Sequence, residues 1–125
     1  MDDKSKKHID DLIFNFGGFH DCRVNEICLD FKNERMVIKM ENILFGLYNT
    51  QDYEAGSGYI LLKGIDEVQF TRLNPENNYI VKKSISNRME TDYLEILMGN
   101  GQILSSQISE LEVWKGDKMI ACSLT

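Results

Sequence analysis

An adjacent histidine and aspartate, His20-Asp21, form the pair in this chain best suited to chemistry. An imidazole beside a carboxylate can ligate a metal ion or work as an acid–base pair. Both roles need further ligands, and the only other histidine, His8, belongs to a different predicted element. We therefore predict a structural role for both residues. Asp21 accepts a backbone hydrogen bond and His20 packs where a helix meets a strand.

The three cysteines, Cys22, Cys28 and Cys122, do not form a recognisable site. Their spacing lacks the short C-x₂₋₄-C motif that places two thiolates on one zinc ion, even with His20 as a further ligand. Their odd number also argues against a disulfide scaffold. Each lies in an apolar, strand-like run, which predicts a small buried residue with a free thiol. We expect a reducing cytoplasm, no metal and no cofactor.

No motif of a known catalytic machinery is present. Residues 56–58, Gly-Ser-Gly, are followed by neither a Lys-Ser/Thr pair nor a helical pattern, so they do not predict a phosphate-binding loop. We interpret them as the end of a flexible loop. The chain has no G-x-S-x-G nucleophile elbow and no thiol placed beside a base. The sequence therefore predicts a protein that is not an enzyme.

The segment 46–58 is the best candidate for a binding site. It is polar and aperiodic, and a loop of this length is often functional. Aromatic side chains near it either close the edge of the core or, when exposed, anchor an interface. If the segment binds a partner, we expect two tyrosine anchors and two acidic contacts, namely Tyr48, Tyr53, Asp52 and Glu54.

One amphipathic helix is predicted at the N-terminus. Ile9, Leu12, Ile13 and Phe16 follow the i, i+3, i+4, i+7 spacing of a single helix face. The pair Gly17-Gly18 stops the pattern, because glycine adopts a positive φ at little cost. We expect the helix over residues 3–15.

The rest of the chain predicts β-structure. A change in the parity of apolar residues near Asn25-Glu26 indicates a β-bulge or two short strands. Residues 22–31 and 36–41 form a predicted hairpin, and Gly99-Asn100-Gly101 marks a second tight turn. Strand patterns continue over residues 59–62, 65–70, 79–85, 94–98, 102–114 (one strand or two) and 119–124.

These elements predict a mainly β (α+β) fold with one N-terminal helix. Seven or eight antiparallel strands would curl into a sandwich or an open barrel, with the helix over one face or open end. The length of 125 residues fits a single domain, and the apolar fraction of 42% is ordinary for a globular protein. No apolar run approaches the length of a membrane span.

The formal net charge of −6 disfavours a nucleic-acid-binding protein. Two stretches are rich in acids: residues 41–70 carry five acids and only Lys63 as a cation, and residues 89–114 carry five acids and no lysine or arginine. A basic stretch, residues 71–88, separates them. Two interpretations remain open: solvated strand faces, or an acidic face for a basic partner.

The opening of the chain resembles a loose class of small bacterial proteins, some of them similar to immunity proteins of toxin systems. In this class a short helix leads to a Phe-His-Asp motif, matched by residues 19–21. A strand of the form Val-x-x-Ile-x-Leu-Asp follows, matched by Val24, Ile27, Leu29 and Asp30. The resemblance covers residues 10–45 and implies no catalytic residues.

Two functions follow as hypotheses. The first is a protein-interaction module, an immunity-like inhibitor that masks a basic toxin. The second is a small-ligand-binding barrel whose apolar mouth lies between the helix and the long loop. An enzyme that uses His20 and Asp21 ranks third.

Overall fold

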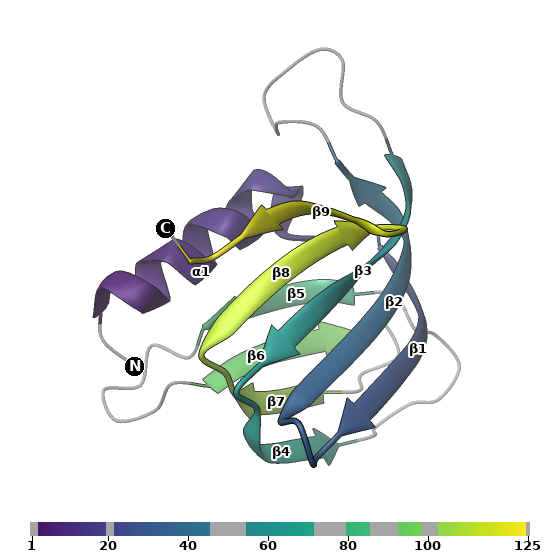
Figure 1. Ribbon diagram of the computed structural model, residues 1–125. Coiled ribbons are helices and arrows are strands. Elements are labelled where there is room, and N and C mark those ends of the chain that lie inside the picture. The colour runs from purple at the N-terminus through teal and green to yellow at the C-terminus, as the bar shows by residue number, and fades with distance from the viewer. Residues whose placement is uncertain are drawn as a thin grey trace.

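A computed structural model describes residues 3–19, 22–45, 55–71, 80–85, 93–98 and 103–124 (Figure 1). These residues form one α-helix, one short 3₁₀ turn and nine strands in two antiparallel sheets. The predicted mainly β fold with an N-terminal helix is therefore confirmed. The choice between a sandwich and an open barrel stays a prediction. In the described part of the chain, no helix is long and apolar enough to cross a membrane.

Helix α1 spans Asp3–Asn15, as its apolar spacing predicts. Ile9, Leu12 and Ile13 are buried on one face. The helix ends where Gly17 and Gly18 take φ angles of 66° and 72°, values that favour glycine. A 3₁₀ turn, η1 (Gly17–Phe19), then leads toward the first strand.

Phe19 is held in a conformation that its backbone alone disfavours. Its φ is 53°, and a left-handed conformation costs roughly 1–2 kcal/mol for a residue with a side chain. Its ring is 0% exposed and stacks on Phe16 at 5.5 Å between ring centroids. Burial of a phenylalanine contributes about 1.5–3 kcal/mol, which offsets the backbone cost.

The first sheet has five strands in the order β1-β2-β3-β8-β9. The predicted bulge is confirmed, because the β1–β2 register shifts between Val24 and Glu26. The predicted hairpin is also confirmed, since these two strands pair antiparallel. The strands are β1 (Arg23–Asp30), β2 (Arg35–Leu44), β3 (Ala55–Lys63), β8 (Glu110–Lys115) and β9 (Lys118–Cys122).

The second sheet has four strands in the order β4-β7-β6-β5. The pattern over residues 102–114, which predicts one strand or two, divides at Ile108 and Ser109 into a strand of each sheet. The antiparallel pairing of β6 and β7 agrees with a hairpin at this place, although its turn lies outside the described residues. The strands are β4 (Asp66–Thr71), β5 (Ile80–Ile85), β6 (Tyr93–Met98) and β7 (Ile103–Gln107).

One core joins the helix and both sheets. Alternate residues of the strands are buried, as the two-residue period of a strand requires. Helix α1 contacts β5 and lies beside β9 (Figure 1). These are edge strands of the two sheets, so the helix covers one edge of each sheet. Covering edge strands protects their unpaired backbone groups. The buried core includes Ile9, Leu12, Ile38, Met40, Ile60, Leu62, Leu94, Ile96, Leu104, Leu111 and Val113.

Two expectations from the sequence are wrong. Residues 55–58 belong to β3 rather than to a flexible loop. Glycines stand there because neighbours come close: a Cβ on Gly58 would clash with the carbonyl oxygen of Trp114 and lie 2.8 Å from Cζ of Phe45. Cys28 is exposed rather than buried, because its position on β1 faces away from the core; Cys22 is buried and Cys122 half-buried.

Candidate functional site

The six residues predicted to form the His-Asp motif and the partner-binding segment lie outside the described residues: His20, Asp21, Tyr48, Asp52, Tyr53 and Glu54. Their roles therefore stay predictions. The structure does fix the residues on either side of segment 46–54. Leu44 pairs with Ala55 across β2 and β3, so the segment starts and ends at the same end of the five-stranded sheet.

The second histidine, His8, lies on α1 and lines a small cavity of 220 Å³. Ser109 and Ser123 line the same cavity. Among the described residues, this lining holds no carboxylate and no thiol. The cavity therefore places His8 beside serine hydroxyls and Lys4, without a carboxylate among its described residues to orient the imidazole.

The outer face of the five-stranded sheet assembles side chains that are distant in the sequence. Lys63 pairs with Glu110, Leu61 with Glu112, and Tyr59 with Trp114, so β3 and β8 place three pairs in successive rows. The residues between them, such as Ile60 and Val113, point into the core. Because strand residues alternate between faces, the three pairs share the opposite, outer face.

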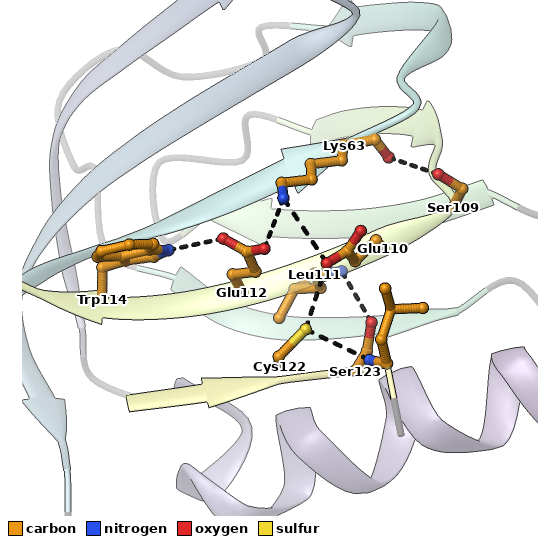
Figure 2. Close-up of polar contacts among 9 residues, drawn as sticks. Lys63, Ser109, Glu110, Leu111, Glu112, Trp114, Cys122 and Ser123 are labelled. Atoms are coloured by element: carbon orange, nitrogen blue, oxygen red, sulfur yellow. Dashed lines mark hydrogen bonds and ion pairs between the residues drawn. The ribbon is translucent and has the colours of Figure 1, made fainter. Parts of the chain in front are cut away.

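Lys63 bridges two carboxylates of β8 (Figure 2). Its Nζ lies 2.6 Å from Oε2 of Glu112 and 3.7 Å from Oε1 of Glu110. Glu112 is only 5% exposed despite its outward register. A buried carboxylate needs a partner, and this lysine supplies both the charge and the hydrogen bond.

The indole of Trp114 is a second hydrogen-bond donor to Glu112. Its Nε1 donates a hydrogen bond to Oε1 of Glu112 at 2.8 Å. Its ring stacks on Tyr59, with 5.9 Å between centroids and 5° between ring planes. Both rings are half-buried, so part of the aromatic pair remains exposed on the sheet face.

Lys63 and Glu112 are both charged at neutral pH. Burial alone would raise the pKa of Glu112, but hydrogen bonds from Lys63 and Trp114 outweigh burial and hold it below its ordinary value. The hydrogen bond with Glu112 raises the pKa of Lys63 above its ordinary value. Each shift favours the charged form of its own group, so the two residues form a persistent ion pair.

The network reaches the edge of the sheet at Cys122. Its thiol donates a hydrogen bond to Oε1 of Glu110 at 3.2 Å, and the backbone N–H of Leu124 donates to its sulfur at 3.4 Å. Burial raises the pKa of the Cys122 thiol, and the neighbouring Glu110 raises it further. The thiol is therefore protonated at neutral pH, which disfavours a role as a nucleophile.

Glu110, Glu112 and Cys122 form a group of potential metal ligands within the described residues. Their ligand atoms lie within 4.8 Å of one another. Carboxylates and a thiolate could bind a divalent cation such as zinc. Lys63, however, already places a positive charge against both carboxylates, and the thiol would have to lose its proton. Lys63 thus occupies the place next to both carboxylates that a cation would take.

A larger cavity of 460 Å³ lies between α1 and the edge strand β9. Phe45, the residue that precedes segment 46–54, also lines it. Lys115 places its Nζ 5.0 Å from the centroid of the Phe45 ring, a cation–π contact. The lining residues are Leu12 and Asn15 of α1, Phe16 directly after it, Phe45, and Ile120, Ala121 and Cys122 of β9.

The sequence carries a partial signal for the Lys63 network. Residues 110, 112 and 114 alternate with buried Leu111 and Val113, so a strand there must place two acids and a tryptophan on one face. Lys63 is also the only cation among residues 41–70. The pairing of β3 with β8 brings Lys63 next to the two acids. Neither segment alone predicts this pairing.

Comparisons with known protein families, with characterised proteins and with solved structures find no match to this chain. The resemblance of residues 10–45 to immunity-like proteins therefore stays a prediction. The function has to be inferred from the site itself.

Proposed function

We propose that this chain is a non-enzymatic interaction module that binds a protein partner through the outer face of its five-stranded sheet. The observation that carries the proposal is the stacked pair of Tyr59 and Trp114, which is half-buried and held in place by the hydrogen bond to Glu112. Aromatic side chains that are already ordered lose little entropy on binding. Tyrosine and tryptophan are also the residues most enriched at the centres of interfaces.

Charged side chains surround the aromatic pair. Lys39 and Glu26 form an ion pair in the same cross-strand row, 3.4 Å apart, and Lys63 with Glu110 lies further along β3 and β8. A polar rim around an apolar centre is the usual composition of a protein interface. The net charge of −6 favours a basic partner through long-range steering.

We infer that segment 46–54 forms part of the same binding surface. It leaves and re-enters the described chain at the end of the sheet that carries Tyr59 and Trp114. We assign Tyr48 and Tyr53 as further anchors and Asp52 and Glu54 as charge partners. The partner is then a protein with a basic surface, and an immunity-like inhibitor of a bacterial toxin is the role that combines these features.

Three observations fit this proposal, and the first of them favours it over an enzyme. The pKa shifts keep Lys63 and Glu112 charged and Cys122 protonated, whereas a general base or a nucleophile needs the opposite shifts. The acidic charge disfavours nucleic acid as the partner. All three cysteines are free thiols, which suits the cytoplasm.

The test is capture of a partner by the immobilised protein from a lysate of its source organism, followed by binding kinetics with the purified partner. We expect Trp114→Ala to raise the dissociation rate at least roughly tenfold, because it removes a central anchor. Phe31→Ala is the matched control, since this phenylalanine is exposed at the far end of the β1–β2 hairpin. Circular dichroism and melting curves check that each variant is folded.

A second arm tests the charges. The double change Asp52→Asn and Glu54→Gln should slow association and leave dissociation nearly unchanged, and added salt should have the same effect. Tyr48→Ala or Tyr53→Ala should instead speed dissociation. A partner that dissociates equally slowly from Trp114→Ala and from the unmodified protein would exclude the sheet face as the binding surface.

A further inference from the structure

The cavity between α1 and β9 has the size of a small-molecule site. Its volume of 460 Å³ falls within the range of roughly 300–1,000 Å³ that is typical of ligand pockets. It shares Cys122 with the network of the outer sheet face but contains neither Tyr59 nor Trp114, and its walls are one side of α1, the edge strand β9 and Phe45. An inference about it therefore does not depend on the interaction function proposed above.

The chemistry of the walls defines what could bind. Leu12, Phe16, Phe45 and Ile120 contribute aliphatic and aromatic carbon, and no charged side chain is among the described lining residues. A charged group among these walls would lose its hydration, which is costly. Lys115 contacts the Phe45 ring but is not among the lining residues, so it offers no charge inside the cavity. The walls therefore favour a neutral, mostly apolar molecule.

Two polar groups can orient such a molecule. The first is the side-chain amide of Asn15, the last residue of α1, which is exposed and so lies at the mouth of the cavity. An amide can both donate and accept hydrogen bonds. A ligand with a hydroxyl, carbonyl or amide group at one end could place that group at the mouth and its apolar body inside.

The second polar group is the backbone of Cys122. Ser123 donates its N–H to the carbonyl of Leu111, so residue 123 directs its backbone groups toward β8. Alternate residues of a strand direct these groups to opposite sides. The N–H and C=O of Cys122 therefore point away from β8, toward the side of β9 that lines the cavity.

The occupant is a small molecule rather than an added β-strand. Helix α1 lies along β9 (Figure 1). Leu12 of the helix and Phe16, directly after it, line the same space. A sixth strand would have to lie about 4.8 Å from β9, which is where the helix side chains stand. We propose that this cavity binds a neutral, largely apolar small molecule that carries one uncharged hydrogen-bonding group.

The test compares two naphthalene dyes that differ in charge. A neutral naphthyl ketone carries one carbonyl group, whereas an anilinonaphthalene sulfonate carries a full negative charge. We expect saturable one-to-one binding of the neutral dye, with a blue shift of its emission. The sulfonate dye should bind at least roughly tenfold more weakly, because its charge would lie among uncharged walls.

Ala121→Leu fills the cavity and should weaken binding of the neutral dye at least roughly tenfold, since the added carbons occupy the ligand's space. The matched control is Ala55→Leu, the same exchange at an exposed position of β3, which should bind the dye normally. Asn15→Asp keeps the size of the side chain and adds a charge at the mouth. This variant should weaken binding of the neutral dye several-fold. It tests the proposal even if Ala121→Leu fails to fold.

Three results would overturn the proposal. The first is no saturable binding of the neutral dye to the unmodified protein. The second is equal or tighter binding of the sulfonate dye. The third is unchanged binding of the neutral dye to a folded Ala121→Leu or to Asn15→Asp.

Discussion

Lys63 forms a much less exposed ion pair than Lys39, which lies on the same sheet face. Its side chain is 29% exposed and contacts a carboxylate that is almost fully buried. Lys39 pairs with Glu26, and more than half of each side chain is exposed to solvent. Exposed pairs contribute little to stability, whereas loss of one partner from a buried pair leaves an uncompensated charge.

We therefore expect Lys63→Met to lower the free energy of unfolding by about 2 kcal/mol, less than the roughly 3–5 kcal/mol of a fully buried pair because Lys63 remains partly solvated. The measurement is urea unfolding at neutral pH. Lys39→Met, the matched control, should change stability little. Equal losses in the two variants would show that the burial of Glu112 has no energetic consequence.

The same pair predicts how stability depends on pH. The pKa of Glu112 is below its ordinary value of 4.5, so the carboxylate contributes stability above that pH and loses the contribution as pH falls through the lower, folded-state value. The pKa of Lys63 is above 10.5, so its contribution is lost only as pH rises through that higher value. Between these limits the pair's contribution should be constant.

Glu112→Gln removes the group that titrates in acid. We expect the unmodified protein to lose more stability than this variant when the pH is lowered from 7 to about 3, because only the former must protonate a hydrogen-bonded carboxylate. Urea unfolding of both proteins across this range gives the comparison. Parallel stability curves for the two would contradict the lowered pKa of Glu112.

At the scale of one element, β3 shows why glycine can be required inside a strand. The strand lies between β2 and β8, and at Gly58 the carbonyl of Trp114 and the ring of Phe45 occupy the space of a side chain. At Gly56, the nearest neighbour of an added methyl group would be Cε2 of Phe45, at an ordinary 3.4 Å. The two glycines, two residues apart, are thus under different constraints.

Gly58→Ala should lower the free energy of unfolding by about 2 kcal/mol, the typical result of overpacking. Gly56→Ala should be neutral or slightly stabilising, because alanine restricts the unfolded chain more than glycine does. Thermal melting followed by far-ultraviolet circular dichroism measures both. A harmless Gly58→Ala would mean that β3 and β8 can separate at this point without cost.

Across the whole molecule, the buried turn after α1 ties the helix to the sheets. Phe19 is 0% exposed, and η1, the turn that contains it, contacts both β2 and β5, so this turn joins the helix to both sheets. Phe19→Ala should destabilise the fold by about 3 kcal/mol, as expected for a deleted core phenylalanine. Phe31→Ala, at a ring that is 69% exposed, should cost less than about 0.5 kcal/mol. Denaturant unfolding of both variants tests this, and similar losses would place Phe19 outside the core.

Local patterns in the sequence predicted the local elements of this molecule. The spacing of Ile9, Leu12, Ile13 and Phe16 located α1, and the parity change near Asn25 located the bulge of β1. Glycines at 56 and 58 misled the prediction, because a close approach by Trp114 and Phe45 is a non-local property. The site escaped prediction for the same reason: Lys63 meets Glu110 and Glu112 only through the pairing of β3 with β8.

Trp114 is the only tryptophan in the chain, and this makes the outer sheet face optically visible. Selective excitation of indole reports on one side chain, whose N–H contacts the carboxylate of Glu112 and whose ring lies on Tyr59. A protein partner that covers this ring should shift its emission to the blue. The residues that line the α1–β9 cavity include neither Trp114 nor Tyr59, so a molecule bound there should change the emission less. One fluorescence spectrum can therefore report which of the two surfaces is occupied.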